Sequence, residues 1–137
     1  MSTERVVHVA GIADAGLPDR VFDALETLWD AAPHVGEEDR SLFALAVSEI
    51  AANVVEHAEA REPIHVSVAL SVDDDALGAV FTDTADPALI DLGRVSMPGE
   101  DAESGRGLAL ALATLDELVH ETHDGNTWRL RRDIRPL

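Results

Sequence analysis

The sequence predicts an α+β fold, a two-layer α/β sandwich with three helices on one face of a mixed, mainly antiparallel sheet. Segments with helical and strand periodicity follow each other in the order β-α-α-β-β-loop-α-β-β. Two pairs of neighbouring strands are separated by the turn signals Asp73-Asp74-Asp75 and Asp124-Gly125, as in antiparallel hairpins. The chain has 137 residues and shows neither a repeat nor a linker, so we expect a single domain over residues 1–137.

The first half of the chain is predicted to form a strand and two helices. Residues 5–12 are a short apolar run of the strand type. A helix is predicted to begin at Leu17-Pro18-Asp19, because proline suits the first turn and an acid favours its positive end, and to end before Pro33. A second helix is predicted from about Glu38 to Glu59. Its apolar stripe consists of Phe43, Val47, Ile50 and Val54.

The second half is predicted to form two hairpins, a long loop and a third helix. Strict alternation over residues 64–72 and a return from Ala76 to Thr82 predict the first hairpin. No sustained period follows between Asp83 and Ser104, which predicts a long loop. The third helix is predicted to start at Gly105-Arg106-Gly107, and its apolar stripe to be Leu108, Ala111, Leu112, Leu115 and Val119. In the last hairpin Trp128 and Leu130 should face inward, and Arg129 and Arg131 outward.

Composition excludes several classes of function. The formal net charge is −17, and all ten basic residues are arginine. Such a field repels phosphate backbones and anionic lipids, so neither nucleic acid nor a membrane is an expected partner. The absence of cysteine excludes disulfides, thiol catalysis and zinc–thiolate sites. Neither a signal peptide nor an apolar run long enough to span a membrane is visible, so we expect a cytoplasmic protein.

Polar residues line one face of the second predicted helix. Glu49, Asn53 and His57 recur at a spacing of four residues and therefore lie alongside each other. A carboxylate one turn before a carboxamide can place a proton acceptor beside a ligand for a hard metal ion. The alternative is an ordinary solvated face. For His57 we expect a structural hydrogen bond at the helix end.

Three blocks of the chain, in a defined order, carry a family resemblance. Residues 48–57 (SEIAANVVEH) contain the helix motif, residues 81–87 (FTDTADP) place Asp83 after a strand, and residues 104–110 (SGRGLAL) hold two glycines at a helix start. These blocks resemble the N box, the first nucleotide box and the second glycine box of the anti-sigma-factor serine kinases, which belong to the GHKL ATPase superfamily. The resemblance implies their Bergerat ATP-binding fold, with ATP and Mg²⁺ as cofactors.

The resemblance also implies roles for single residues. Glu49 is then the catalytic base for the acceptor serine, and Asn53 is the Mg²⁺ ligand and part of the nucleotide site. Asp83 accepts a hydrogen bond from the adenine amino group. Ala85 occupies a position beside the purine where the family usually has glycine. The ordinary alternatives are an exposed helix carboxylate for Glu49 and a helix-surface amide for Asn53.

The glycine turn is the expected phosphate site. Gly105 and Gly107 permit close backbone approach, and free N–H groups at a helix start attract phosphate. Arg106 would add a charge-assisted contact. These local contacts matter because the global negative charge repels ATP. The alternative is a flexible hinge for the preceding loop, and both roles are compatible.

The implied function is that of a cytoplasmic, ATP-dependent protein serine/threonine kinase and anti-sigma regulator. Its substrate would be an anti-sigma antagonist domain, a sigma factor is a second candidate partner, and a homodimer is a candidate assembly. The loop from Asp83 to Ser104 would be a lid that nucleotide orders. The alternative function is a nucleotide-sensing module that sequesters a protein partner without transferring phosphate. Ala85 and Pro87 favour this alternative because they replace family glycines, whereas Glu49 and Asn53 favour the kinase.

Overall fold

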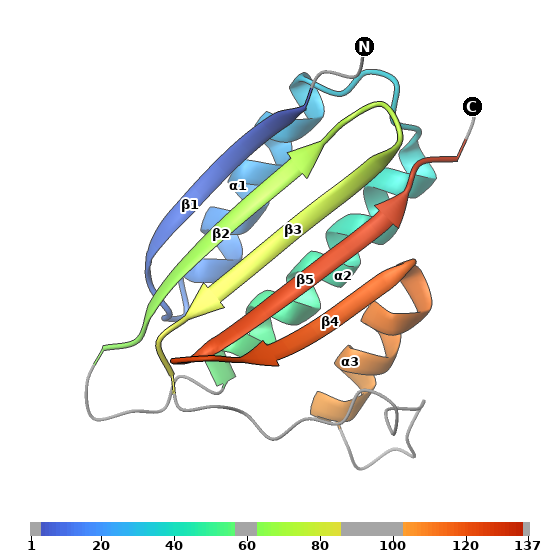
Figure 1. The fold of residues 1–137 in the computed structure, drawn as a ribbon. Coiled ribbons are helices and arrows are strands. Elements are labelled where there is room, and N and C mark those ends of the chain that lie inside the picture. The colour runs from blue at the N-terminus through green and yellow to red at the C-terminus, as the bar shows by residue number, and fades with distance from the viewer. Residues whose placement is uncertain (1–3, 57–62, 86–102, 136–137) are drawn as a thin grey trace.

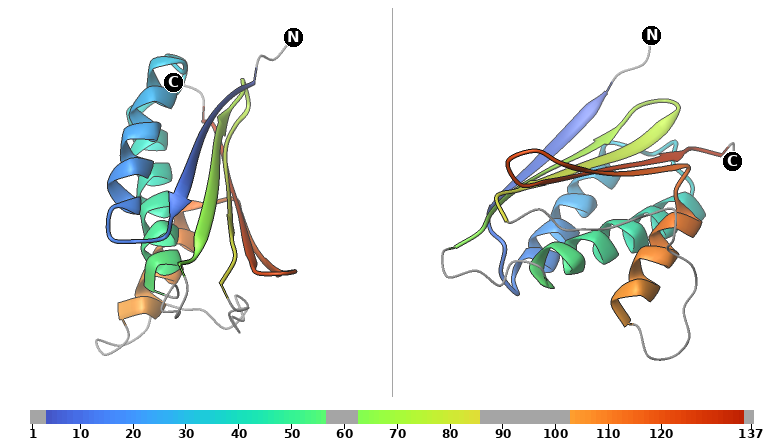
Figure 2. Two further views of the ribbon diagram at one scale, coloured as in Figure 1. Left: turned by 90° about the vertical axis from the view of Figure 1, so that its left-hand side faces the viewer. Right: turned by 60° about the horizontal axis from the view of Figure 1, so that its bottom comes forward.

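The computed structural model describes residues 4–56, 63–85 and 103–135, with the backbone alone for residues 103–105. Three helices cover one face of a five-stranded sheet in these residues, and the other face is open (Figures 1 and 2). The elements are β1 (Arg5–Ile12), α1 (Leu17–Asp30), α2 (Glu37–Glu56), β2 (His65–Val72), β3 (Ala76–Asp83), α3 (Glu103–Thr114), β4 (Glu117–Thr122) and β5 (Asn126–Asp133). The predicted α+β sandwich and its element order are confirmed.

The sheet has the strand order β1-β2-β3-β5-β4, and every pairing among these strands is antiparallel. The last strand, β5, therefore lies between β3 and β4 rather than at an edge (Figure 1). Its register places Asn126, the first residue of β5, opposite Asp83, the last residue of β3. This pairing brings together two residues that are far apart in the sequence.

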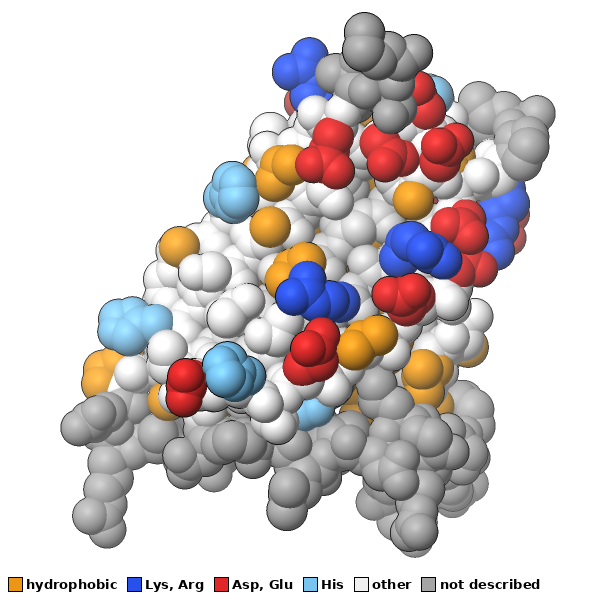
Figure 3. Space-filling model, in the orientation of Figure 1, with side chains coloured by type: hydrophobic (Ala, Val, Ile, Leu, Met, Phe, Trp, Pro, Cys, Tyr) orange, Lys and Arg blue, Asp and Glu red, His pale blue; other side chains and the backbone are white. Residues whose placement is uncertain are grey.

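The core lies between the sheet and the helices. Phe43, Val47 and Ile50 of α2 are fully buried, as their helical spacing predicts. Opposite them, the strands alternate as predicted, and Trp128 and Leu130 of β5 face the core. The uncovered face carries few charged side chains over β1 to β3, and its acids and arginines gather towards the β2–β3 turn and β4–β5 (Figure 3). No helix in the described residues is both long and apolar enough to cross a membrane.

A buried ion pair joins the start of α2 to β5. Arg132 donates from Nε to Oδ1 of Asp39 over 2.9 Å, and its Nη2 lies 2.8 Å from the same oxygen. A third guanidinium contact, from Nη1, reaches the carbonyl oxygen of Thr114 at the end of α3 over 2.7 Å. The backbone N–H of Arg135 donates to Oδ2 of Asp39 over 2.9 Å. One arginine thus ties together α2, α3 and β5.

The prediction for the third helix is wrong at both of its ends. It begins at Glu103, two residues before Gly105, and ends at Thr114. Leu115 follows the helix, and Val119 lies in β4 instead of continuing the helical stripe. The second helix begins at Glu37, and the part predicted beyond Glu56 lies outside the described residues.

Pairing with β5 explains why α3 stops where it does. The backbone N–H of Asp116 donates to the carbonyl oxygen of Arg131 over 2.8 Å, so the chain joins the sheet directly after the helix. The Asp116 carboxylate accepts a 2.7 Å hydrogen bond from the backbone N–H of Asp133 and a 3.1 Å bond from Arg135. These bonds, the backbone one first, lower the pKa of Asp116 from its usual 3.8. Tertiary contacts here override the helical period.

Candidate functional site

The predicted site residues lie on segments that meet at one end of the sandwich. The C-terminal part of α2, the end of β3, the start of α3 and the start of β5 all lie at the lower end in Figure 1. Glu49 and Asn53 belong to α2, Asp83 ends β3, and Gly105 and Gly107 belong to the first turns of α3. The fold therefore collects at one end the three blocks that were recognised separately in the sequence.

Glu49 lies directly against Gly107. The backbone of α3 approaches α2 so closely that a Cβ on Gly107 would lie 2.5 Å from Oε2 of Glu49, well inside contact distance. Only glycine leaves room for the carboxylate at this point. The structure thus places the predicted base beside the predicted phosphate turn. It also shows what Gly107 does, which is to make space for Glu49.

Asn53 is buried, with 6% of its surface exposed, and its amide nitrogen meets no hydrogen-bond partner among the described residues. An unpaired buried amide costs on the order of 1–3 kcal/mol, so a partner beyond the described residues, such as a bound ligand, would be favourable here. A half-turn of the side-chain amide would present Oδ1 in the same place. A carboxamide oxygen is a suitable ligand for Mg²⁺, so the Asn53 side chain fits the predicted ion.

A metal ion here would depend on ligands brought by the nucleotide. In residues 4–56, 63–85 and 103–135, no group of three or more acidic or histidine side chains could hold a metal ion by itself. Mg²⁺ typically takes one or two ligands from the protein and the rest from phosphates and water. One carboxamide is therefore sufficient on the protein side, provided that the ion arrives with phosphate.

Asp83 is buried at the end of β3, with 4% of its surface exposed. Its Oδ1 accepts two hydrogen bonds of 3.0 Å, from the backbone N–H of Ala85 and from Nδ2 of Asn126. No hydrogen bond within the described residues reaches Oδ2. The carboxylate is thus held by one oxygen and offers the other as an acceptor, which suits an amino group of a ligand.

The sequence did not reveal two further residues, Asn126 and His120, that lie near Asp83 at the end of β3. Asn126 is buried and contacts Asp83, and Nε2 of His120 on β4 lies 2.9 Å from Oδ1 of Asn126. Gly125 precedes Asn126 with φ of 130°, and a Cβ on Gly125 would overlap the carbonyl oxygen of Asp83. The Asp124-Gly125 hairpin signal pointed to this turn, but only the register of β5 against β3 shows that Asn126 meets Asp83.

The predicted glycine turn before a helix is wrong in its position. Gly105, Arg106 and Gly107 lie inside α3, which begins at Glu103. Gly105 and Arg106 are among the first four residues of α3, whose N–H groups have no acceptor within the helix. Gly107 is the fifth residue, so its N–H group has a helical acceptor. Arg106 is exposed, and its predicted phosphate contact stays a prediction.

Ala85 is buried beside Asp83, and its N–H group is already bonded to that carboxylate. Ala85 also belongs to the cluster of buried hydrophobic residues. His57 lies outside the described residues. Residues 86–102, which include Pro87 and form the main part of the predicted loop and lid, also lie outside them. The predictions for these residues stay predictions.

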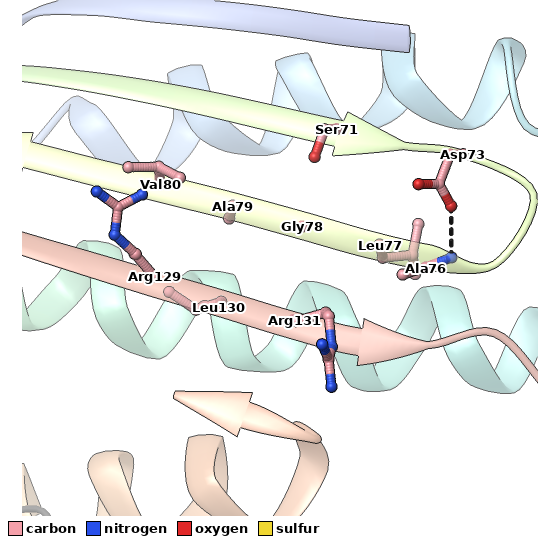
Figure 4. Close-up of a pocket in the computed structure, with 10 residues that line it drawn as sticks. All are labelled: Ser71, Asp73, Ala76, Leu77, Gly78, Ala79, Val80, Arg129, Leu130 and Arg131. Carbon is pink, nitrogen blue, oxygen red and sulfur yellow. Dashed lines mark hydrogen bonds between the residues drawn. The ribbon is translucent and has the colours of Figure 1, made fainter. Parts of the chain in front are cut away.

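A hollow of about 240 Å³ on the uncovered face of the sheet is not part of this site. It is lined by residues of β2, β3 and β5, among them Ser71, Arg129 and Arg131 (Figure 4). Both arginines already have acidic partners, with Arg129 on Glu121 and Arg131 on Glu117. Their charges are therefore compensated within the sheet, and the hollow offers little attraction for a phosphate.

Comparison with known families agrees with this geometry. Residues 12–132, nearly the whole chain, match the model of a family described as the histidine kinase-like ATPase domain. The match includes every element from the end of β1 to β5 and all the site residues discussed above. No curated protein matches the chain.

Proposed function

Because the chain belongs to the histidine kinase-like ATPase domain family, we propose that it binds ATP with Mg²⁺ and transfers the γ-phosphoryl group to a serine of an anti-sigma antagonist domain. The observation that carries the proposal is the position of Glu49. Its carboxylate lies against Gly107 of α3, one helical turn before Asn53, whose amide nitrogen has no hydrogen-bond partner in the described part of the chain. A proposed base, a proposed metal ligand and the first turns of α3, which would bind phosphate, then lie close to each other, as phosphoryl transfer requires.

Each residue has a chemical task in this proposal. Asp83 accepts a hydrogen bond from the purine amino group, and Asn53 binds Mg²⁺ through its carboxamide oxygen. When bound to Asn53, Mg²⁺ would neutralise phosphate charge, which matters in a chain whose net charge is −17. Glu49 takes the proton from the serine hydroxyl while the serine oxygen forms a bond to the γ-phosphorus. The bond to the β–γ bridging oxygen breaks, and ADP leaves.

A second candidate function is a module that senses nucleotide and sequesters a protein partner without phosphoryl transfer. Ala85 favours it, because this buried residue stands where the resembling family usually has glycine and its N–H group is already bonded to Asp83. The packing of Glu49 against Gly107 favours the kinase, because a module that only binds nucleotide has no need of a positioned base. An assay with labelled ATP, Mg²⁺ and an antagonist domain, followed for phosphoserine, separates the two.

The variant Asn53→Ala should lose Mg²⁺-dependent ATP binding. Removing the proposed ligand should weaken affinity by roughly tenfold or more, which corresponds to about 1.4 kcal/mol. Titration calorimetry with ATP and Mg²⁺ measures this loss, and circular dichroism verifies the fold. With EDTA the wild type should bind as weakly as the variant. If the wild type binds no ATP at millimolar concentration, the site assignment is wrong.

The variant Gly107→Ala should raise stability and lower phosphoryl transfer. Alanine favours a helix over glycine by about 1 kcal/mol. The new Cβ collides with the flexible end of Glu49, so the carboxylate must swing away rather than the backbone move. Urea unfolding should give an equal or higher free energy of unfolding, while the transfer rate falls. A variant that transfers phosphate at the wild-type rate would contradict the importance of this contact.

A further inference from the structure

A chain of hydrogen bonds runs from β4 through β5 to Asp83. Nε2 of His120 lies 2.9 Å from Oδ1 of Asn126, and Nδ2 of Asn126 donates to Oδ1 of Asp83 over 3.0 Å. Asn126 and Asp83 are both buried, with 3% and 4% of their surfaces exposed. The ring of His120 packs on Trp128 with a centroid distance of 4.3 Å, which fixes its orientation. This series of hydrogen bonds therefore connects residues whose positions are well defined.

The chemistry of these groups fixes which group donates in each of the hydrogen bonds. A carboxylate only accepts hydrogen bonds, so the amide of Asn126 must turn its nitrogen to Asp83 and its oxygen to His120. The amide oxygen also only accepts, so Nε2 of His120 must carry the hydrogen. Every bond therefore donates towards Asp83. The amide orientation and the histidine tautomer follow from a single carboxylate at the end of the chain.

We propose that Asn126 and His120 are positioning residues that make the site selective for a purine with an amino group at position 6. This inference rests on the proposed nucleotide site. Asn126 occupies Oδ1 of Asp83 together with the N–H of Ala85, so Oδ2 is held as the acceptor for the ligand. His120 keeps Asn126 in the orientation that does so. His120 donates to the other end of the same amide, so its loss removes this donor and weakens the orientation in which Nδ2 of Asn126 faces Oδ1 of Asp83.

A comparison of ATP with inosine triphosphate isolates the amino group, because inosine carries an oxygen in its place. Calorimetry in the presence of Mg²⁺ would measure both affinities for the wild type, His120→Phe and His120→Gln. Phenylalanine keeps a ring on Trp128 but has no donor, whereas glutamine can place an N–H group near the position of Nε2. His123→Phe is the control, since His123 is exposed in the β4–β5 turn.

The wild type should prefer ATP. His120→Phe should reduce this preference by about tenfold, as the loss of one well-placed hydrogen bond does, and leave the affinity for inosine triphosphate nearly unchanged. His120→Gln and His123→Phe should retain it. Equal losses for both nucleotides, or an unchanged preference in His120→Phe, would overturn the positioning role while leaving ATP binding intact. A wild type that binds neither nucleotide would instead overturn the proposed function, and this inference with it.

Nitrogen NMR of the free protein tests the direction of the chain without any nucleotide. Neutral His120 should be the tautomer with hydrogen on Nε2, and Asn126→Leu should remove this preference. A hydrogen on Nδ1 in the wild type would contradict the bond to Asn126 as assigned, and with it the proposal.

Discussion

Glu49→Gln should reduce phosphoryl transfer to the antagonist domain by about 10²–10⁴-fold, the usual cost of losing a general base. Glutamine keeps the shape of the side chain and can still pack against Gly107, but it cannot take the serine proton. ATP affinity and stability should change little, because Glu49 is not a proposed metal ligand. The measurement is the single-turnover rate of phosphoserine formation, with calorimetry for ATP binding.

Glu56→Gln is the matched control, because it makes the same change on an exposed carboxylate of the same helix. This variant should transfer phosphate at the wild-type rate. If Glu49→Gln also retains that rate, Glu49 is not the base. If the wild type transfers no phosphate to its cognate antagonist although it binds ATP, the sequestering module becomes the better description.

Arg132→Met should destabilise the protein by about 3–5 kcal/mol, because it leaves the buried carboxylate of Asp39 without its counter-charge. The loss also frees the carbonyl of Thr114 at the end of α3. Urea unfolding measures the free energy of unfolding. The double variant Arg132→Met with Asp39→Leu should recover part of the loss, since it removes the unpaired charge as well.

Arg129→Met provides the comparison, because Arg129 forms an exposed ion pair with Glu121 on the neighbouring strand. Exposed pairs contribute about 0–1 kcal/mol, so this variant should unfold close to the wild type. A loss of less than about 1 kcal/mol for Arg132→Met would show that the Asp39 carboxylate finds another partner or becomes protonated, and would contradict the central role of this ion pair.

Local patterns predict most of the fold, because they depend on neighbours in the chain. The alternation of Val66, Val68 and Leu70 identifies β2, and the stripe of Phe43 and Val47 identifies α2. The end of α3 could not be predicted in this way. The stripe that continues to Val119 is helical in sequence, but pairing with β5 takes this residue into the sheet.

The site divides in the same way. Glu49 and Asn53 are visible in the sequence because both lie on one helix at a spacing of four residues. Asn126 and His120 are not, because their contacts depend on the register of β5 between β3 and β4. Asp39 and Arg132 are separated by 93 positions, and nothing local connects them. Charge and polarity alone do not say which distant partner a buried group will find.

The position of β5 in the sheet has a consequence for how the protein is made. While the chain emerges from the ribosome, β1, β2 and β3 can pair as soon as residues 5–83 are free, but β3 keeps an open edge. Unpaired edges are sites of aggregation, and this one persists for the time needed to add about fifty more residues. Asp83 gains its hydrogen bond from Nδ2 of Asn126 only after residue 126 has been added. A growing chain is therefore exposed to misassociation at β3, the strand that ends in Asp83.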